Sequence, residues 1–167
     1  MANTKDNLEA AFAGESQANR KYLFFSEKAD DAGNSQVARL FRAAAEAETV
    51  HARNHLKVLG EIKSDTENLQ AAVGGENYEF TEMYPEFIEK AKSEGNDKAE
   101  NSFDLANRVE KIHHKLFGAA LKDLEAAKAF KDEPYYVCQI CGNTVEGEAP
   151  ERCPVCGAPR SRFKKVD

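Results

Sequence analysis

Apolar side chains recur every three or four residues over most of the chain, which is the spacing of amphipathic helices. Gly33, Gly60 and Gly95 stand where successive stretches stop, and glycine often ends a helix because it accepts left-handed backbone angles. The pattern predicts four helices, over residues 4–32, 35–60, 65–94 and 97–128. Long helices joined by short turns pack as an antiparallel bundle, so we expect an all-α four-helix bundle over residues 1–133.

Short local signals refine the third and fourth helices. Ser64-x-x-Glu67 and Asp97-x-x-Glu100 have the spacing of capping boxes, so we expect them to open these two helices. Pro85 should kink the third helix, because proline lacks the N–H group that the helical hydrogen bond needs.

Glutamate interrupts each apolar stripe at mid-length, where a leucine would pack. The five residues are Glu15, Glu48, Glu76, Glu79 and Glu110. A buried carboxylate costs several kcal/mol unless a positive charge compensates it. Two divalent metal ions would nearly balance five carboxylates, so the pattern points to a two-metal site.

Two of these glutamates begin Glu-x-x-His pairs, Glu48 with His51 and Glu110 with His113. Residues three apart lie on one face of a helix, so both side chains of a pair can point into the bundle. One Glu from each of two helices, with Glu-x-x-His from each of the other two, is the ligand set of di-iron carboxylate bundles. A single such pair in an acidic chain would more often be a surface ion pair, but two pairs in apolar stripes favour a metal site.

A faint internal repeat selects among the histidines. Gly-Glu precedes one Glu-x-x-His pair by 33 residues and the other by 34 residues. This repeat favours His51 over His55 and His113 over His114 as ligands. We interpret His55 as a core residue or as a group that supports a ligand.

The charge balance narrows the choice of partners. The 167-residue chain carries 23 Lys and Arg against 29 Asp and Glu, a net charge of −6. Proteins that bind nucleic acid usually present a basic surface, so we expect no nucleic acid partner. No apolar run reaches the roughly 20 residues that a membrane helix needs, and the first residues lack the apolar core of a signal peptide. We therefore expect a cytoplasmic protein with no membrane partner.

The last part of the chain is of a different kind. Residues 134–167 contain all four cysteines and four of the five prolines, and they are too few to fold around an apolar core alone. Two C-x2-C pairs, Cys138 with Cys141 and Cys153 with Cys156, are each followed by glycine. Four thiolates suit tetrahedral iron or zinc, and disulfides are less favoured without a secretion signal. A redox two-metal centre in the bundle would favour iron, because zinc is redox-inert.

Taken together, these motifs resemble the rubrerythrin family. The resemblance rests on residues 13–22 and 75–87, both Glu-x-x-His pairs and the four-cysteine unit, and it covers nearly the whole chain. It implies a ferritin-like di-iron bundle fused to a small rubredoxin-like domain of strands and loops. It also implies a peroxidase that reduces hydrogen peroxide to water and protects against oxidative stress. Electrons would come from an NAD(P)H-dependent reductase or a rubredoxin.

The resemblance also implies a role for each site residue. The di-iron ligands would be Glu15, Glu48, His51, Glu76, Glu79, Glu110 and His113. Tyr22 and Tyr84 would line the catalytic pocket. One iron would move between His51 when reduced and Glu79 when oxidised, and the four cysteines would hold a third iron, which zinc could replace in recombinant protein.

Two other functions stay open on the sequence. A ferroxidase or iron-handling protein would need the bundle but not the four-cysteine tail. A zinc-stapled helical module without enzymatic activity would leave the stripe glutamates in solvent.

We further expect at least a head-to-tail homodimer, with electrons crossing between chains. The linker over residues 129–134 is short and stiffened by Pro134, which argues that the tail cannot fold back comfortably against its own di-iron site. Leu105, Val109, Ile112 and Leu116 form a second apolar line on the fourth helix. This line is either a subunit surface or a surface that packs on a neighbouring helix or on the tail.

Overall fold

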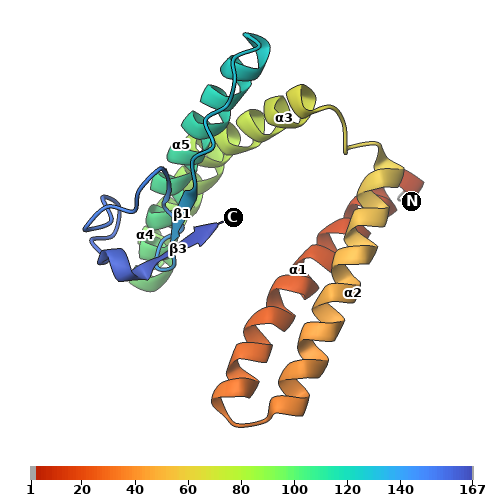
Figure 1. Ribbon diagram of the computed structural model, residues 1–167. Helices are drawn as coiled ribbons and strands as arrows, with labels where there is room; N and C mark the ends of the chain where they lie inside the picture. The colour runs from red at the N-terminus through yellow and green to blue at the C-terminus, as the bar shows by residue number, and fades with distance from the viewer. Residues whose placement is uncertain (1–2, 167) are drawn as a thin grey trace. The chain divides into compact units, whose positions relative to one another are not determined.

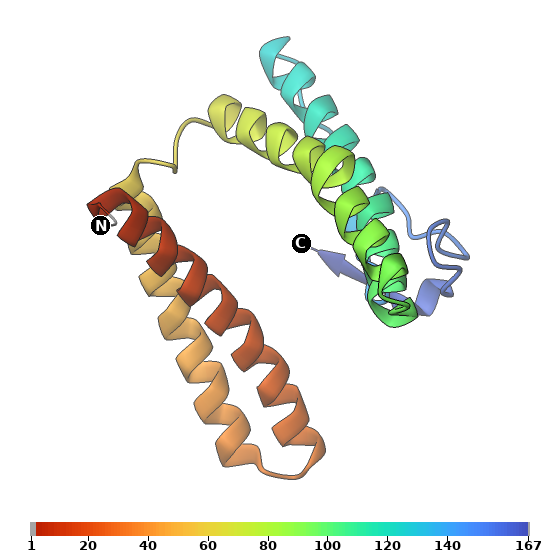
Figure 2. The ribbon, with the colours of Figure 1, turned by 180° about the vertical axis from the view of Figure 1, so that it is seen from behind.

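The computed structural model describes residues 3–166 and divides into two compact units, one ending at Lys63 and the other beginning at Ser64. The first unit is a hairpin of α1 (Thr4–Asp31) and α2 (Ser35–Leu59), which run side by side in opposite directions in both views (Figure 1 and Figure 2). A capping box between Asn3 and Asp6 opens α1, and Gly33, with φ 75°, turns the chain between the helices.

The two helices of the first unit contact each other through small residues. Its buried apolar residues, among those that the structure describes, are Ala29, Ala38 and Ala45. The Asn19 amide donates to the Ala45 carbonyl at 2.7 Å and to the Thr49 hydroxyl at 2.9 Å, which links α1 to α2. Larger apolar side chains such as Phe24 and Leu40 are exposed. A hairpin that buries little beyond alanine leaves much of its apolar surface exposed.

The helical part of the second unit contains α3 (Asp65–Tyr78), the π-helical turn η1 (Glu79–Met83), α4 (Tyr84–Ser93) and α5 (Asp97–Glu125). Both α3 and α4 pack along α5 (Figure 1). The predicted kink at Pro85 is confirmed, but it takes the form of a break that begins before the proline, in η1. Proline has no N–H for the carbonyl four residues back and its ring clashes with that carbonyl, and the wider π turn accommodates both.

Of the two predicted capping boxes, one is found at the start of α3 and the other is not found at the start of α5. Ser64 opens α3 as predicted, because its hydroxyl accepts from the Glu67 N–H while the Glu67 carboxylate accepts from the Ser64 N–H. The predicted cap at Asp97 was wrong. Asn96 is the N-cap of α5, and its side-chain oxygen accepts from the Ala99 N–H at 3.2 Å. Asn and Asp cap helices about equally well, so neighbouring positions compete and the backbone register decides.

The chain reverses direction after α5. Ala127 adopts a φ of 50°, and the Lys128 N–H donates to the Asp123 carbonyl, which closes the helix with a left-handed residue. The following segment leads into an antiparallel sheet of order β2-β1-β3. Its strands are β1 (Tyr135–Cys138), β2 (Thr144–Glu146) and β3 (Phe163–Val166), with the short 3-10 turn η2 (Arg160–Arg162) before β3.

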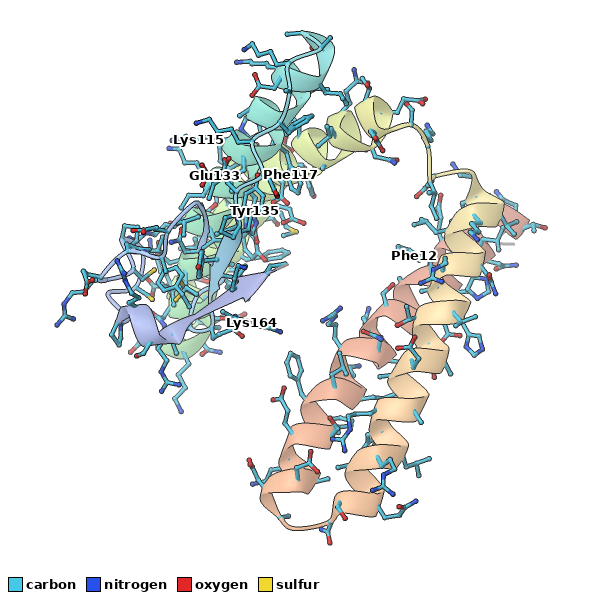
Figure 3. The ribbon with its side chains drawn as sticks, in the orientation of Figure 1. Phe12, Lys115, Phe117, Glu133, Tyr135 and Lys164 are labelled. Carbon is cyan, nitrogen blue, oxygen red and sulfur yellow. The ribbon has the colours of Figure 1, made fainter. Side chains whose placement is uncertain are left out.

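This small sheet and its loops pack against α5 of the same chain. Val109 on α5 is 2% exposed, and a Cβ on Gly142 would lie 3.8 Å from its Cγ1 atom. Tyr135 of β1 and Phe117 of α5 line the same cavity, and Figure 3 shows them side by side. The prediction that the linker is too short for the tail to fold back was therefore wrong, because the reversal at Ala127 sends the linker back along α5. At Val109 the second apolar line is covered by the tail.

The fold class is confirmed as a mostly helical chain that ends in a small strand-and-loop region carrying the four cysteines. The division into a bundle over residues 1–133 and a metal-binding domain over residues 134–167 stays a prediction. Among residues 3–166, no helix combines the length and the apolar character that crossing a bilayer requires.

The buried contact at Val109 predicts how the four-cysteine region is held. Val109→Asp should release this region from α5, because an unpaired carboxylate would replace a buried apolar side chain. Hydrogen exchange at the backbone amides of β2 should become faster by roughly 10-fold or more, as expected for the loss of 1.4 kcal/mol or more of protection. Lys111→Asp, at an exposed position on α5, is the control. Unchanged exchange in Val109→Asp would mean that this contact does not hold the region.

Candidate metal centres

The four cysteines converge in two similar turns. The Gly142 N–H donates to the Cys138 carbonyl at 2.8 Å, and the Gly157 N–H donates to the Cys153 carbonyl at 2.9 Å. Gly142 and Gly157 have φ values of 82° and 78°, which a side chain would strain. Each C-x2-C pair is thus presented by the same backbone turn, closed by a left-handed glycine.

The sulfur atoms have the spacing of a tetrahedral metal site. Sγ of Cys138 lies 3.7 Å from Sγ of Cys156, and Sγ of Cys141 lies 3.6 Å from Sγ of Cys153. A disulfide would bring two sulfurs to about 2.05 Å, whereas four sulfurs at about 2.3 Å from one ion lie about 3.8 Å apart. All four cysteines are free, and their sulfurs lie within 4.8 Å of one another. The donor set therefore fits one tetrahedral thiophilic ion.

Burial and hydrogen bonding shift the pKa values of these thiols in different directions. Burial raises the pKa of Cys141, and neighbouring thiols add to the effect. Burial also acts to raise the pKa of Cys153, but the backbone N–H groups of Cys156 and Val155 outweigh it and lower the pKa to about 7. Of Cys141, Cys153 and Cys156, Cys153 is thus the thiol that ionises most readily.

A second cluster lies in the first unit. Glu15 of α1 faces Glu48 and His51 of α2, and one potential ligand atom of each lies within 4.8 Å of the others. Nδ1 of His51 is 2.9 Å from Glu48 Oε2 and 3.8 Å from Glu15 Oε1. The His51 side chain is 53% exposed. These two carboxylates and one imidazole are three of the seven predicted di-iron ligands.

A third cluster, in the second unit, repeats this arrangement. Glu76 of α3 faces Glu110 and His113 of α5 within the same 4.8 Å limit. Nδ1 of His113 is 2.7 Å from Glu110 Oε2 and 3.9 Å from Glu76 Oε2. The His113 side chain is only 26% exposed. On its other side, Nε2 lies 3.0 Å from the hydroxyl of Thr144 in β2.

The electrostatics of the third cluster favour a cation. Burial, and then the charge of Glu110, raise the pKa of Glu76 to about 7. The hydrogen bond with Glu110 is the main cause that raises the pKa of His113. Glu76 Oε2 is buried without a hydrogen-bond partner among the described residues. Oxygen and imidazole donors suit divalent first-row metals, and an ion here would satisfy the orphaned oxygen and the excess negative charge.

The remaining predicted site residues lie in different surroundings. Glu79 begins η1, and burial followed by the charge of Glu110 raises its pKa. Burial, and then the charge of Glu110, also raise the pKa of Tyr84 in the first turn of α4. Tyr22, in the first unit, packs against Phe25 and Phe41 with ring centroids 6.4 Å and 6.0 Å away.

His113 and the adjacent His114 lie in different surroundings. His114 stacks edge-on against Phe80, with ring centroids 5.4 Å apart, whereas His113 faces the carboxylates.

Thr144 was missed by the sequence reasoning, and no signal in the sequence could have found it. Its contact with His113 joins residues 31 positions apart, and only the packing of the tail on α5 creates it. The joining of both carboxylate clusters into one seven-residue site stays a prediction.

Comparison with known proteins places these clusters in context. The model of the family described as Rubrerythrin matches residues 6–121, and that described as Rubrerythrin, rubredoxin-like domain, matches residues 136–164. Rubrerythrin-2 of Clostridium acetobutylicum is 36% identical over 98% of this chain and 96% of its own length. Nigerythrin of Nitratidesulfovibrio vulgaris is 37% identical over 98% of this chain and 86% of its own. A solved structure of nigerythrin, titled as fully reduced and all ferrous, matches with a TM-score of 0.59 at 36% identity, covering 99% of this chain and 88% of that one.

The raised pKa of Glu76 predicts a pH dependence for the metal-free chain. The pKa rises from its ordinary 4.5 to about 7 on folding, so between these values the folded state holds more protons than the unfolded state. The free energy of unfolding should therefore fall as pH rises from 4.5 to 7. Urea unfolding at several pH values measures this slope, which Glu76→Gln should reduce and the exposed control Glu82→Gln should not. An equal slope in both variants would contradict the assignment.

The thiolate geometry predicts a local effect of cysteine loss. Cys138→Ser should release the metal of this site and unfold β1, β2 and β3, because a region of about this length cannot fold on an apolar core alone and would depend on its ion. The helices should keep their far-ultraviolet circular dichroism. Metal analysis and backbone amide spectra measure the two effects, with exposed Gln139→Ala in the same turn as the control. A sheet that stays folded without its ion would refute this.

Proposed function

The chain belongs to the rubrerythrin family, and from that premise we propose that it is a non-haem iron peroxidase that reduces hydrogen peroxide to water. The observation that carries the proposal is a contact between residues of the two kinds of candidate metal site. His113 of a carboxylate cluster lies 3.0 Å from Thr144 of the four-cysteine region. An iron-storage protein has no need for a second, electron-transferring centre at this place, and a zinc-stapled module has no need for buried carboxylates.

The proposed catalytic site joins both carboxylate clusters in one four-helix bundle. Each cluster offers two carboxylates and one imidazole, which is too few ligands for a two-metal centre. The hairpin of α1 and α2 buries mainly alanine and needs a cover for its apolar face. Packing this hairpin on α3, α4 and α5 would meet both needs, with the second hairpin supplied by the same chain or by a second copy. We keep the homodimer as part of the proposal.

Two iron ions would be held by the seven carboxylate and imidazole residues, and a third by the four cysteines. The bound iron pair would supply the redox chemistry in which hydrogen peroxide, two protons and two electrons give two water molecules. Titles of the nigerythrin structures name mixed-valence, partially reduced and all-ferrous states, which supports iron that changes oxidation state in a relative.

The protein's own residues would position ligands and protons. Tyr84 keeps its phenolic proton, because burial and three nearby carboxylates raise its pKa, so it could donate this proton to hydrogen peroxide that enters beside Glu110. Tyr22 would play a similar part from the first unit. Glu79 and His51 are proposed to exchange as ligands between oxidation states, and the π turn at Glu79 gives that carboxylate a place outside the regular helical register.

Electrons would pass from the four-cysteine iron to the carboxylate site within one chain. The path runs from Cys141 through the adjacent Gly142 to Thr144 and His113, since the Thr144 hydroxyl lies 3.1 Å from the Gly142 carbonyl. This route replaces the expectation that electrons cross between chains. A reductase that uses NAD(P)H, or a rubredoxin, is the proposed donor. Four free thiols suit a reducing compartment, so we propose the cytoplasm as the location.

Loss of one carboxylate ligand tests the activity. Glu48→Ala should lower peroxide turnover at least about 100-fold, the upper end of the loss seen for groups that only support ligands. The iron of the carboxylate site should be lost, while the four-cysteine iron stays bound. Glu46→Ala, exposed on the same helix, should keep both. Turnover is measured with hydrogen peroxide and a reduced rubredoxin, and full activity in Glu48→Ala would defeat the proposal.

Rapid ferrous oxidation by oxygen with no peroxide turnover in the unaltered chain would favour the ferroxidase instead.

Mixing of inactive chains tests the path of the electrons. Glu110→Ala and Cys138→Ser both fall in the second unit. If electrons stay within one chain, a subunit-exchanged mixture of these variants should recover no turnover. Recovery would show transfer between chains. If the first mixture recovers nothing, a mixture of Glu48→Ala with Cys138→Ser decides how the bundle is assembled. This second mixture then recovers activity only when the two hairpins of one bundle come from different chains.

A further inference from the structure

The Thr144 hydroxyl lies between a backbone carbonyl and a histidine. Its Oγ1 is 3.1 Å from the Gly142 carbonyl oxygen and 3.0 Å from His113 Nε2. Thr144 is the first residue of β2 in the four-cysteine region, and His113 lies on α5. The contact therefore spans two parts of the fold that meet only when the sheet is packed on the helix.

Counting protons assigns a direction to this chain of hydrogen bonds. A threonine hydroxyl has one proton to donate, and a carbonyl oxygen can only accept. The Thr144 proton therefore goes to Gly142, and Thr144 accepts from His113 Nε2, which also meets the Gly142 backbone. Nε2 then carries a hydrogen, and a metal ion bound at Nδ1 would replace the hydrogen that Nδ1 otherwise donates to Glu110. Nδ1 is the atom that faces the carboxylates, 2.7 Å from Glu110 Oε2 and 3.9 Å from Glu76 Oε2.

We propose that Thr144 is a positioning residue that holds His113 as the Nε2–H tautomer, with Nδ1 aimed at the metal position between Glu76 and Glu110. Histidine ligands generally donate their second N–H to a fixed acceptor, which sets the ring orientation and strengthens the metal bond. Here the acceptor comes from a different metal-binding region. The inference rests on the proposed function, because it takes His113 to be a ligand.

This arrangement makes one metal site depend on the other. The four-cysteine region needs its own ion to fold, and only the folded region places Thr144 beside His113. Loading of the thiolate site therefore prepares the carboxylate site. His51 belongs to the first unit, where its Nδ1 lies 2.9 Å from Glu48 Oε2 and 3.8 Å from Glu15 Oε1, so its ring serves as an internal reference.

The test compares Thr144→Val with Thr144→Ser. Valine keeps the shape of threonine without the hydroxyl, whereas serine keeps the hydroxyl. The full chain is labelled with ¹⁵N and loaded with zinc at all sites, which keeps it diamagnetic. Long-range proton–nitrogen spectra report the tautomer and the metal-bound nitrogen of each histidine ring, and chelator competition measures the zinc affinity of the carboxylate site. Ser161→Ala removes an exposed hydroxyl from the same region as a control.

The unaltered chain should show His113 bound to zinc through Nδ1, with a slowly exchanging Nε2 proton. Thr144→Val should speed this proton's exchange and weaken zinc binding about 10-fold, the lower end for a group that supports a ligand. Thr144→Ser should restore both, and the His51 signals should not change. An unaltered chain with zinc on Nε2 overturns the proposal even if both variants fail to fold. Equal effects in Thr144→Val and Thr144→Ser, or none in either, also overturn it. If zinc leaves the His113 signals untouched, the ligand assignment itself fails.

Discussion

Carboxylates on the apolar faces of helices are the constraint on which the rest of this structure depends. Glu76 shows the consequence most clearly: its pKa is raised to about 7 and its Oε2 atom is buried without a hydrogen-bond partner among the described residues. Such a group is stable only if a proton or a cation accompanies it. Carboxylates that are costly without a metal therefore mark where a cation would be stabilised, and the helices hold them close enough together to share one.

One face of helix α5 both packs against the four-cysteine region and carries His113. Val109 and His113 are four residues apart, so they lie on the same side of the helix. Val109 takes part in the packing of the four-cysteine region, and His113 meets both Thr144 from that region and Glu110 from its own helix. Packing of the four-cysteine region and the surroundings of His113 are thus consequences of the same contact. The electron path proposed above would use this contact and no additional element.

The two carboxylate clusters are alike in composition but not in surroundings. In each, histidine Nδ1 lies beside the glutamate three residues earlier, at 2.9 Å for His51 and at 2.7 Å for His113. The His51 side chain is 53% exposed and the His113 side chain 26% exposed, and Thr144 of the four-cysteine region lies 3.0 Å from His113 Nε2. The π turn adds a further difference, since it brings Glu79 and Tyr84 near Glu110 and has no counterpart in the described part of α1 or α2. An internal repeat in the sequence has thus become two unequal halves.

The sequence by itself determined the helices, the cap at Ser64, the break near Pro85, the two ligand clusters and the four-thiolate site. These features have local causes, since hydrogen bonds, caps and i, i+3 pairs act over a few residues. Tertiary structure alone decided that the tail folds back on α5, which the stiffness of the linker had argued against. It also decided that Thr144 supports His113, across 31 residues. Such contacts depend on how distant elements pack, and packing follows from the shape and burial of whole surfaces, which no short stretch of sequence contains.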